Sequence, residues 1–144
     1  MKLTLKQVFV KYPLKPSRIA QQFNRSREWV KHLANRPMGK PETTEANLLI
    51  LEEYLVSLGA ELSNITLSSQ PQPGAVTVFD FFQEYPFTTA GMAKYMGRSR
   101  EWLSLIVFNR YKFSPKARDK HILEIQEVLR DIGKDLANLK IIQK

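Results

Sequence analysis

One pentapeptide occurs twice in this chain of 144 residues: RSREW begins at Arg25 and again at Arg98. A chance match of five letters is improbable in so short a chain, and further identities occur at the same spacing of 73 residues. They align Thr4 with Thr77, Tyr12 with Tyr85, Ala20 with Ala93 and Trp29 with Trp102. With one extra residue in the second copy, Gly59 also aligns with Gly133. We therefore expect a fold that one sequence unit can form twice.

The repeat predicts the domain organisation. Residues 1–65 make up the first copy and residues 76–144 the second. Residues 66–75 are predicted to be a linker, because they contain the sequence SSQPQPG and lack a periodic apolar pattern. Two copies are too few for a solenoid, so we expect either two tandem small domains or one fused pseudo-dimer.

Composition narrows the class of protein. A hydrophobic content of 43% with 10% aromatic residues is enough for a packed core. The absence of cysteine excludes disulfides, thiolate nucleophiles and cysteine zinc sites. No apolar run approaches the roughly 20 residues that span a bilayer, and the first residues do not begin a signal peptide. We expect a soluble cytoplasmic protein, associated with the nucleoid if bacterial, with no membrane partner.

The net charge of +8 is unevenly distributed along the chain. Residues 1–40 contain ten lysines and arginines against one glutamate, whereas residues 41–73 contain five glutamates and no lysine or arginine. From residue 74 onward, twelve basic residues stand against eight acidic ones. This gradient favours a polyanion bound on one side of the fold.

Each copy is predicted to contain four helices, which makes the fold all-α. Thr4 and Thr77 are placed to cap the first helix with their hydroxyl groups, and a proline ends that helix in both copies. Candidate caps of the second helix are Ser17 in the first copy and Thr88 or Thr89 in the second.

The fourth helix is the longest in each copy. It is expected to start near Thr43 or Thr44 in the first copy, and at Ser114 with Pro115 in the first helical position in the second. Both helices carry apolar residues at alternating steps of three and four, a heptad-like stripe. The stripes are Leu48, Leu51, Leu55, Leu58 and Leu62, then Ile122, Ile125, Leu129, Ile132 and Leu136. We interpret them as core, or as a seam between the two long helices.

A turn residue separates the second and third helices of each copy. Asn24 and Gly97 hold this position, and asparagine and glycine accept positive φ most readily. A small residue lies four positions earlier, and apolar residues follow six and nine positions later, where they can hold the next helix on the core. These are Ala20, Val30 and Leu33, then Ala93, Leu103 and Ile106. The spacing resembles the helix-turn-helix of lambda repressor and Cro-like proteins over about 20 residues of each copy.

This resemblance implies that the third helix enters the major groove of double-stranded DNA. In the first copy it places Arg25 and Ser26 at the phosphate backbone, Arg27 and Glu28 at base edges, His32 within reach of the groove, and Lys31 and Arg36 at phosphates. Ser26 can also cap the third helix. Arginine pairs with guanine and glutamate accepts from cytosine, so a site containing G·C pairs is implied. Trp29, where the family commonly has a small polar residue, is expected to pack against the protein.

The second copy is predicted to contribute less to DNA reading. Its equivalent DNA-contacting residues are Arg98, Ser99, Arg100, Glu101 and Arg110, with Ser99 the candidate cap. Leu105 takes the place of His32, and the third helix is apolar nearly all round, which predicts burial on more than one side. Its extra apolar surface is expected to contact the first copy, or a second chain in a homodimer.

Nothing in the sequence indicates catalysis, a cofactor or a metal site. His32 and His121 are the only histidines, and neither has a neighbour at metal-ligand or triad spacing. The expectation is a sequence-specific regulator of transcription that binds double-stranded DNA. The main alternative is a helical protein-interaction module that keeps the helix-turn-helix only as a scaffold; RNA binding is weaker, since no aromatic platform for unstacked bases is evident.

Overall fold

The computed structural model describes residues 1–35, 41–108 and 114–143, and in these ranges the protein is predominantly helical, which confirms the all-α prediction. The helices are α1 (Leu5–Lys11), α2 (Pro16–Gln22), α3 (Arg27–Asn35), α4 (Pro41–Leu62), α5 (Val78–Glu84), α6 (Thr89–Tyr95), α7 (Arg100–Val107) and α8 (Pro115–Ala137). Four two-residue strands accompany them: β1 (Lys2–Leu3), β2 (Leu67–Ser68), β3 (Val76–Thr77) and β4 (Lys140–Ile141).

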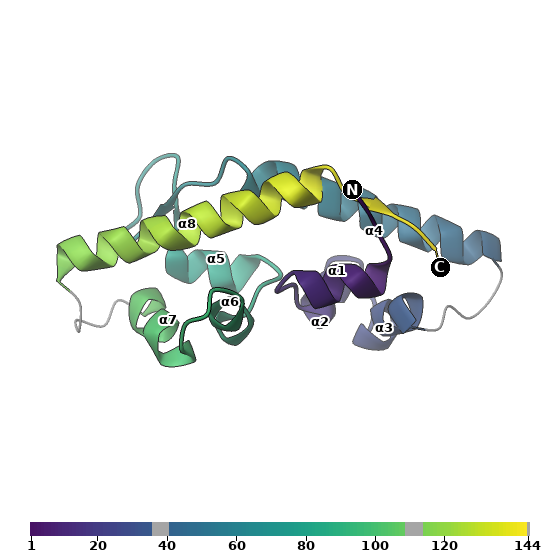
Figure 1. Cartoon of the computed structure of the whole chain (residues 1–144), viewed down its shortest axis with the longest axis horizontal. Coiled ribbons are helices and arrows are strands. Elements are labelled where there is room, and N and C mark those ends of the chain that lie inside the picture. The colour runs from purple at the N-terminus through teal and green to yellow at the C-terminus, as the bar shows by residue number, and fades with distance from the viewer. Residues whose placement is uncertain (36–40, 109–113, 144) are drawn as a thin grey trace.

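The molecule is elongated and has two layers (Figure 1). The long helices α4 and α8 form one layer and run in opposite directions across each other. The short helices form the other layer in two groups, with α1, α2 and α3 under α4 and with α5, α6 and α7 under α8. The third helices α3 and α7 therefore lie on the same side of the molecule, away from the long helices.

The two long helices pack through the apolar stripes that the sequence predicts. All ten stripe residues are buried, which confirms their assignment to the core and to the seam between α4 and α8. The two backbones approach each other closely at Gly59 and Gly133. A methyl group added at either glycine would lie 2.7 Å from the carbonyl oxygen of the other, so the crossing has no room for a side chain.

The ends of each half pair with the other half. Strand β1 pairs in parallel with β4, and β2 pairs in parallel with β3. The segment that follows each long helix, here called its tail, is also bound by a side chain of the other long helix. The Leu67 amide donates to Gln126 Oε1 at 2.9 Å, and the Ile141 amide donates to Glu52 Oε1 at 2.7 Å. The two donors, Leu67 and Ile141, are 74 residues apart in the chain, and so are the two acceptors, Glu52 and Gln126. Part of segment 66–75, the predicted linker, thus forms β2 and is buried.

One hydrophobic core extends through both halves of the chain. The halves also meet at an antiparallel bridge between Leu14 and Phe87, two residues 73 positions apart. Beside it, the Arg18 guanidinium donates to the carbonyl oxygens of Phe82 at 2.7 Å and Phe87 at 2.6 Å, and to that of Gln83.

Helix caps agree with the sequence at most predicted positions. The side chains of Thr4, Thr77, Thr88, Ser99 and Ser114 each accept a backbone hydrogen bond at a helix start. Two predictions in the first half are wrong: α2 begins at Pro16, with Ser17 inside it, and α4 begins at Pro41 instead of near Thr43 or Thr44. At α2 the cause is that proline is well suited to the first helical position, which Pro16 takes.

Candidate nucleic-acid interface

The turn between the second and third helices has the same geometry in both halves. Asn24 has a φ of 53° and Gly97 a φ of 70°, which confirms the predicted positive values. The next amide closes the turn by donating to the carbonyl of the buried alanine, from Arg25 to Ala20 at 3.0 Å and from Arg98 to Ala93 at 2.9 Å. The sequence therefore forms the same tight helix–turn–helix corner twice.

Helix α3 buries one face and exposes the other. Val30 and Leu33 are buried against the core, as predicted from the spacing. The predicted DNA-contacting residues lie outside this buried face: Arg25 and Ser26 precede α3 and are exposed, Arg27, Glu28 and His32 of α3 are exposed, and Lys31 is half-buried. Arg36 lies outside the described residues. The structure thus brings the first-half set together at one exposed end of the short-helix layer (Figure 1).

Two tryptophans hold the first arginine of each RSREW motif. The Arg25 guanidinium lies 5.3 Å from the ring centroid of Trp29, and that of Arg98 lies 4.5 Å from the ring of Trp102. Trp29 also packs against Phe23, which confirms that its role in the fold is packing. A cation over a tryptophan face is stabilised by the ring electrons, so the repeated Arg-x-x-x-Trp pattern positions the guanidinium beside the turn.

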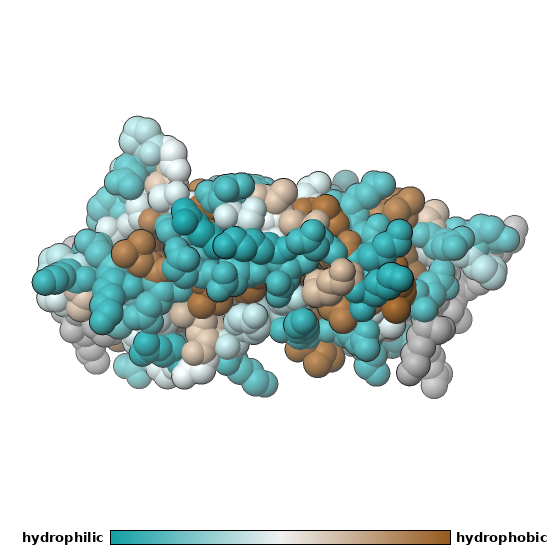
Figure 2. All heavy atoms as spheres, turned by 45° about the horizontal axis from the view of Figure 1, so that its top comes forward, coloured by the Kyte–Doolittle hydropathy of each residue, from teal (hydrophilic) through white to brown (hydrophobic). Residues whose placement is uncertain are grey.

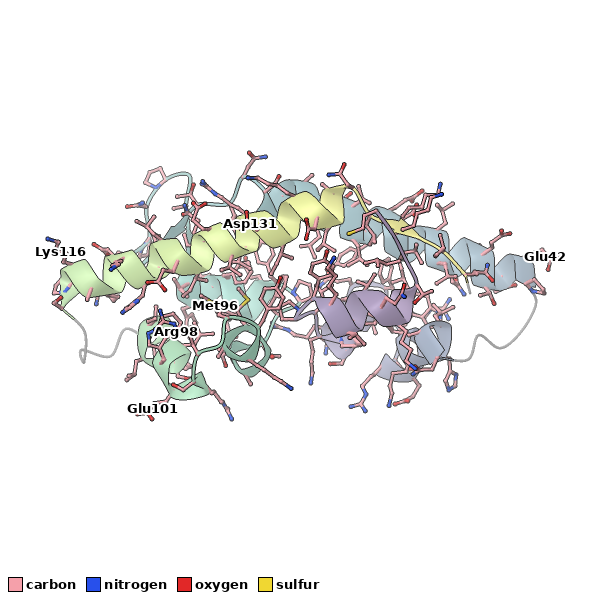
Figure 3. All side chains as sticks on the ribbon, in the orientation of Figure 1. Glu42, Met96, Arg98, Glu101, Lys116 and Asp131 are labelled. Atoms are coloured by element: carbon pink, nitrogen blue, oxygen red, sulfur yellow. The ribbon has the colours of Figure 1, made fainter. Side chains whose placement is uncertain are left out.

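The first arginine of RSREW forms an ion pair in the second half, as Arg98, but not in the first half, as Arg25. Arg98 pairs with Glu124 of α8 at 2.9 Å, and His121 lies 3.3 Å from the same carboxylate. Figure 3 shows Arg98 turned toward α8, whereas Glu101 points away from it. Ile50 holds the position equivalent to Glu124, and Arg25 forms no ion pair with any described residue. Arg25 therefore keeps its charge available to an anion.

The remaining described residues that were predicted to contact DNA in the second half are exposed, like their first-half counterparts. Ser99, Arg100 and Glu101 are exposed, but the Ser99 hydroxyl already accepts the Trp102 amide at 3.0 Å as the cap of α7. Arg110 lies outside the described residues. This cap uses only a lone pair of the Ser99 oxygen, so the hydroxyl hydrogen can still be donated to a phosphate.

Charge separates the two groups of short helices. Residues 1–35 carry eight lysines and arginines against Glu28 alone, whereas residues 76–107 carry three basic and three acidic side chains. Helix α4 has five glutamates and no lysine or arginine. The positive charge of the first half therefore lies in its short helices and turns, on the side of α3.

The opposite face of the molecule is different in character. Figure 2 shows mainly hydrophilic side chains over the long helices, with hydrophobic ones gathered mostly in the half that holds the chain termini. This face does not combine the basic charge and exposed polar residues of the α3 side.

Helix α7 is partly buried, as its apolar sequence predicts. Leu103, Ile106 and Val107 are buried and Leu105 is half-buried. Phe108 directly after the helix remains 53% exposed and packs edge-to-face against Phe79, whose exposed fraction is 42%. The second half thus presents an exposed aromatic pair, in which Phe79 takes the place of the cation Lys6.

Two basic residues that the sequence analysis did not single out complete the first-half surface. Lys6 of α1 and Lys15 before α2 line a groove together with Arg27 and Lys31. The signal that could have found them lies in the repeat itself, because the aligned positions hold Phe79 and Thr88. A charged residue in only one of two aligned copies points to a function that the fold does not require.

Comparisons with known proteins assign no function to the chain. No protein-family model, curated protein or solved structure matches the chain. None of the described helices combines the length and apolar composition needed to cross a bilayer. In the same residues no three histidine, aspartate or glutamate side chains are grouped so that they could hold a metal ion.

Proposed function

We propose that the chain comprises two tandem four-helix repeats, each containing a helix-turn-helix, and that it binds double-stranded DNA sequence-specifically as a regulator of transcription. The observation that carries this proposal is the exposed basic face of α3, where Arg25 and Arg27 flank the helix start without a described ion-pair partner. A helix that presents basic and hydrogen-bonding side chains from a rigid corner suits the major groove.

The side chains of α3 and of the turn before it have distinct proposed roles. Arg25, fixed by Trp29, contacts a phosphate, and Lys31 contacts another at the side of the groove. Arg27 and Glu28 lie in the first turn of α3, where they meet base edges, with His32 one turn further along. Arginine recognises guanine and glutamate recognises cytosine, so the preferred site contains G·C pairs.

The placement of α3 and α7 supports engagement of one DNA duplex by both halves. Leu33 of α3 lies beside Leu48 of α4, and the α7 residue Trp102 lies against His121 of α8. These contacts are 11 and 12 residues from the crossing glycines, so at a rise of 1.5 Å per residue the third helices are on the order of 30 Å apart. Successive major grooves on one face of B-DNA are about 34 Å apart.

The first experiment is fluorescence anisotropy with a labelled pool of random duplexes at two salt concentrations. Wild-type protein should bind at low salt and weaken steeply as salt rises, since bound phosphates release counterions. A triple alanine variant at Arg25, Arg27 and Lys31 should lose this binding. A triple alanine variant at Lys94, Arg98 and Arg100 removes the same charge from the second half and should lose much less. Absence of binding at low salt would refute the proposal.

A second candidate function rests on the exposed Phe79–Phe108 pair. Edge-to-face aromatic rings at the surface suit a protein interface, and a second copy of this chain is the partner expected from sequence. Sedimentation velocity over a range of concentrations tests it: dimers that survive high salt and disappear on Phe108→Ser support an apolar interface through the second half.

A further inference from the structure

A groove of about 390 Å³ lies between α1 and α3 in the first half. Phe9 and Ala34 supply apolar surface inside it. Four cationic side chains surround this surface: Lys6, Lys15, Arg27 and Lys31. The lining contains no aspartate or glutamate. The groove therefore combines an apolar interior with a rim of one sign of charge.

The repeat shows that the fold does not need this rim. The aligned positions in the second half hold Phe79 in place of Lys6, Thr88 in place of Lys15 and Ser104 in place of Lys31. Only the arginine is retained, as Arg100. Phe79 there packs against Phe108 instead of facing an anion. The second half therefore forms the same fold without these lysines, so the fold does not require the cations around the first-half groove.

Like charges around one groove repel each other, so their grouping is favourable only when an anion binds among them. A phosphate alone would need the cations but not the apolar interior. Val10 at the edge of the groove is 81% exposed, which leaves apolar surface beside the lysines for a ligand to cover. The groove volume falls within the roughly 300–1,000 Å³ of small-molecule sites.

We infer that this groove binds a small amphipathic anion, in which a carboxylate, phosphate or sulfonate group is attached to an apolar body. The apolar body lies against Phe9, Val10 and Ala34, and the anionic group lies among the lysines. This site overlaps the proposed DNA surface, because Arg27, assigned to a base edge, and Lys31, assigned to a phosphate, line both. If the proposed function holds, the bound anion competes with DNA for these two side chains.

The binding is tested without DNA, by titrating the ¹⁵N-labelled full chain in two-dimensional NMR. Three probes separate the contributions: octanoate has both an anionic group and an apolar chain, acetate has only the anionic group, and octan-1-ol only the chain. Octanoate should shift the amides of Phe9, Val10 and residues 30–34 with saturation, and it should bind at least about tenfold more tightly than either other probe. Equal binding of octan-1-ol and octanoate, or shifts spread over the whole molecule, would overturn the proposal.

Charge-reversal variants locate the anionic group. Lys6→Glu and Lys15→Glu change exposed side chains of the rim and should each weaken octanoate binding by about tenfold or more. Lys116→Glu makes the same charge change at the far end of α8 (Figure 3) and should leave octanoate binding unchanged. Equal weakening by all three variants would show a general charge effect and would also overturn the site.

Competition with DNA is measured separately, so that the two proposals can fail independently. Octanoate binding with no DNA binding in the anisotropy assay would refute the proposed function and leave the groove assignment intact. If both ligands bind, octanoate should displace the duplex pool from wild-type protein but not from Lys15→Glu at the same octanoate concentration. Displacement unaffected by Lys15→Glu would show that octanoate acts outside the groove.

Discussion

Gly59 and Gly133 face each other backbone to backbone at the crossing of α4 and α8. A methyl group built on either residue would approach the carbonyl oxygen of the other to the same 2.7 Å. Because the repeat aligns these two glycines, the contact is reciprocal, as it is between two subunits related by a twofold axis. The strand pairs and the tail hydrogen bonds follow the same reciprocal pattern.

This contact leads to a prediction about stability. Gly59→Ala and Gly133→Ala should each lower the free energy of unfolding by about 1–3 kcal/mol, because the methyl group must push two helices apart. Ser57→Ala, on an exposed position of α4, is the matched control and should change it by less than about 0.5 kcal/mol. Urea unfolding followed by circular dichroism measures all three, and an unchanged midpoint for Gly59→Ala would contradict the close crossing.

Arg18 provides a test of the contact between the halves. Its guanidinium binds three carbonyl oxygens of the second half, and the aligned position there is Gly91, so the contact occurs in one direction only. Arg18→Ala should lower the free energy of unfolding by about 2 kcal/mol, since it removes charge-assisted hydrogen bonds to partly buried carbonyls. Gln21→Ala on the exposed face of the same helix is the control in urea unfolding, and equal effects of both changes would argue against a special role of Arg18.

The ion pair between Arg98 and Glu124 can be removed from the second half and introduced into the first half by single substitutions. Ile50→Glu gives Arg25 the carboxylate that Arg98 has, and it should weaken DNA binding up to about fivefold, the strength of an exposed ion pair. Glu124→Ile frees Arg98 and should strengthen binding by a similar or smaller factor. Anisotropy at several salt concentrations provides the readout. Changes of the same sign in both variants would show that these pairs do not control the charge available to DNA.

The proposed roles within RSREW differ between its two arginines. Arg27→Ala should cost about 1–3 kcal/mol of binding free energy on a cognate site and relax the preference there, whereas Arg25→Ala should weaken binding to all sequences alike. Selection of bound duplexes by sequencing identifies the cognate site, and anisotropy on cognate and random duplexes measures both variants. Equal losses on the two duplexes for Arg27→Ala would remove its assignment to base reading.

Two tyrosines predict an alkaline limit to stability. Tyr12 donates a hydrogen bond to Asp135 at 3.0 Å and Tyr85 donates to Glu61, and burial followed by these bonds raises the pKa of both phenols well above the ordinary value of 10.0. Above about pH 10 the unfolded chain loses phenol protons that the folded chain keeps, so the free energy of unfolding falls as pH rises.

The corresponding measurement is urea unfolding at pH 8 and pH 10.5 for wild type and for the double variant Tyr12→Phe, Tyr85→Phe. The variant should be about 1 kcal/mol less stable per lost hydrogen bond at pH 8, and this gap should narrow at pH 10.5. A gap of the same size at both pH values would show that the phenols do not cause the alkaline loss.

The sequence predicted the features that depend on neighbouring residues. Helix periods, the buried stripes, the positive φ of Asn24 and Gly97 and five hydroxyl caps are all encoded within a few positions, and the structure confirms them. The error at Ser17 is of the same local kind, because Pro16 takes the first helical position of α2.

The repeat by itself indicated two similar units in one chain, but it did not decide between two separate domains and one fused pseudo-dimer. Only the tertiary structure decided that each tail pairs with the opposite half, that Glu124 neutralises Arg98, and that Lys6 and Lys15 join α3 around one groove. These contacts join residues far apart in the chain, such as Leu67 and Gln126. A periodic pattern shows which face of a helix is buried, but it does not show what buries it; that depends on how the long helices cross.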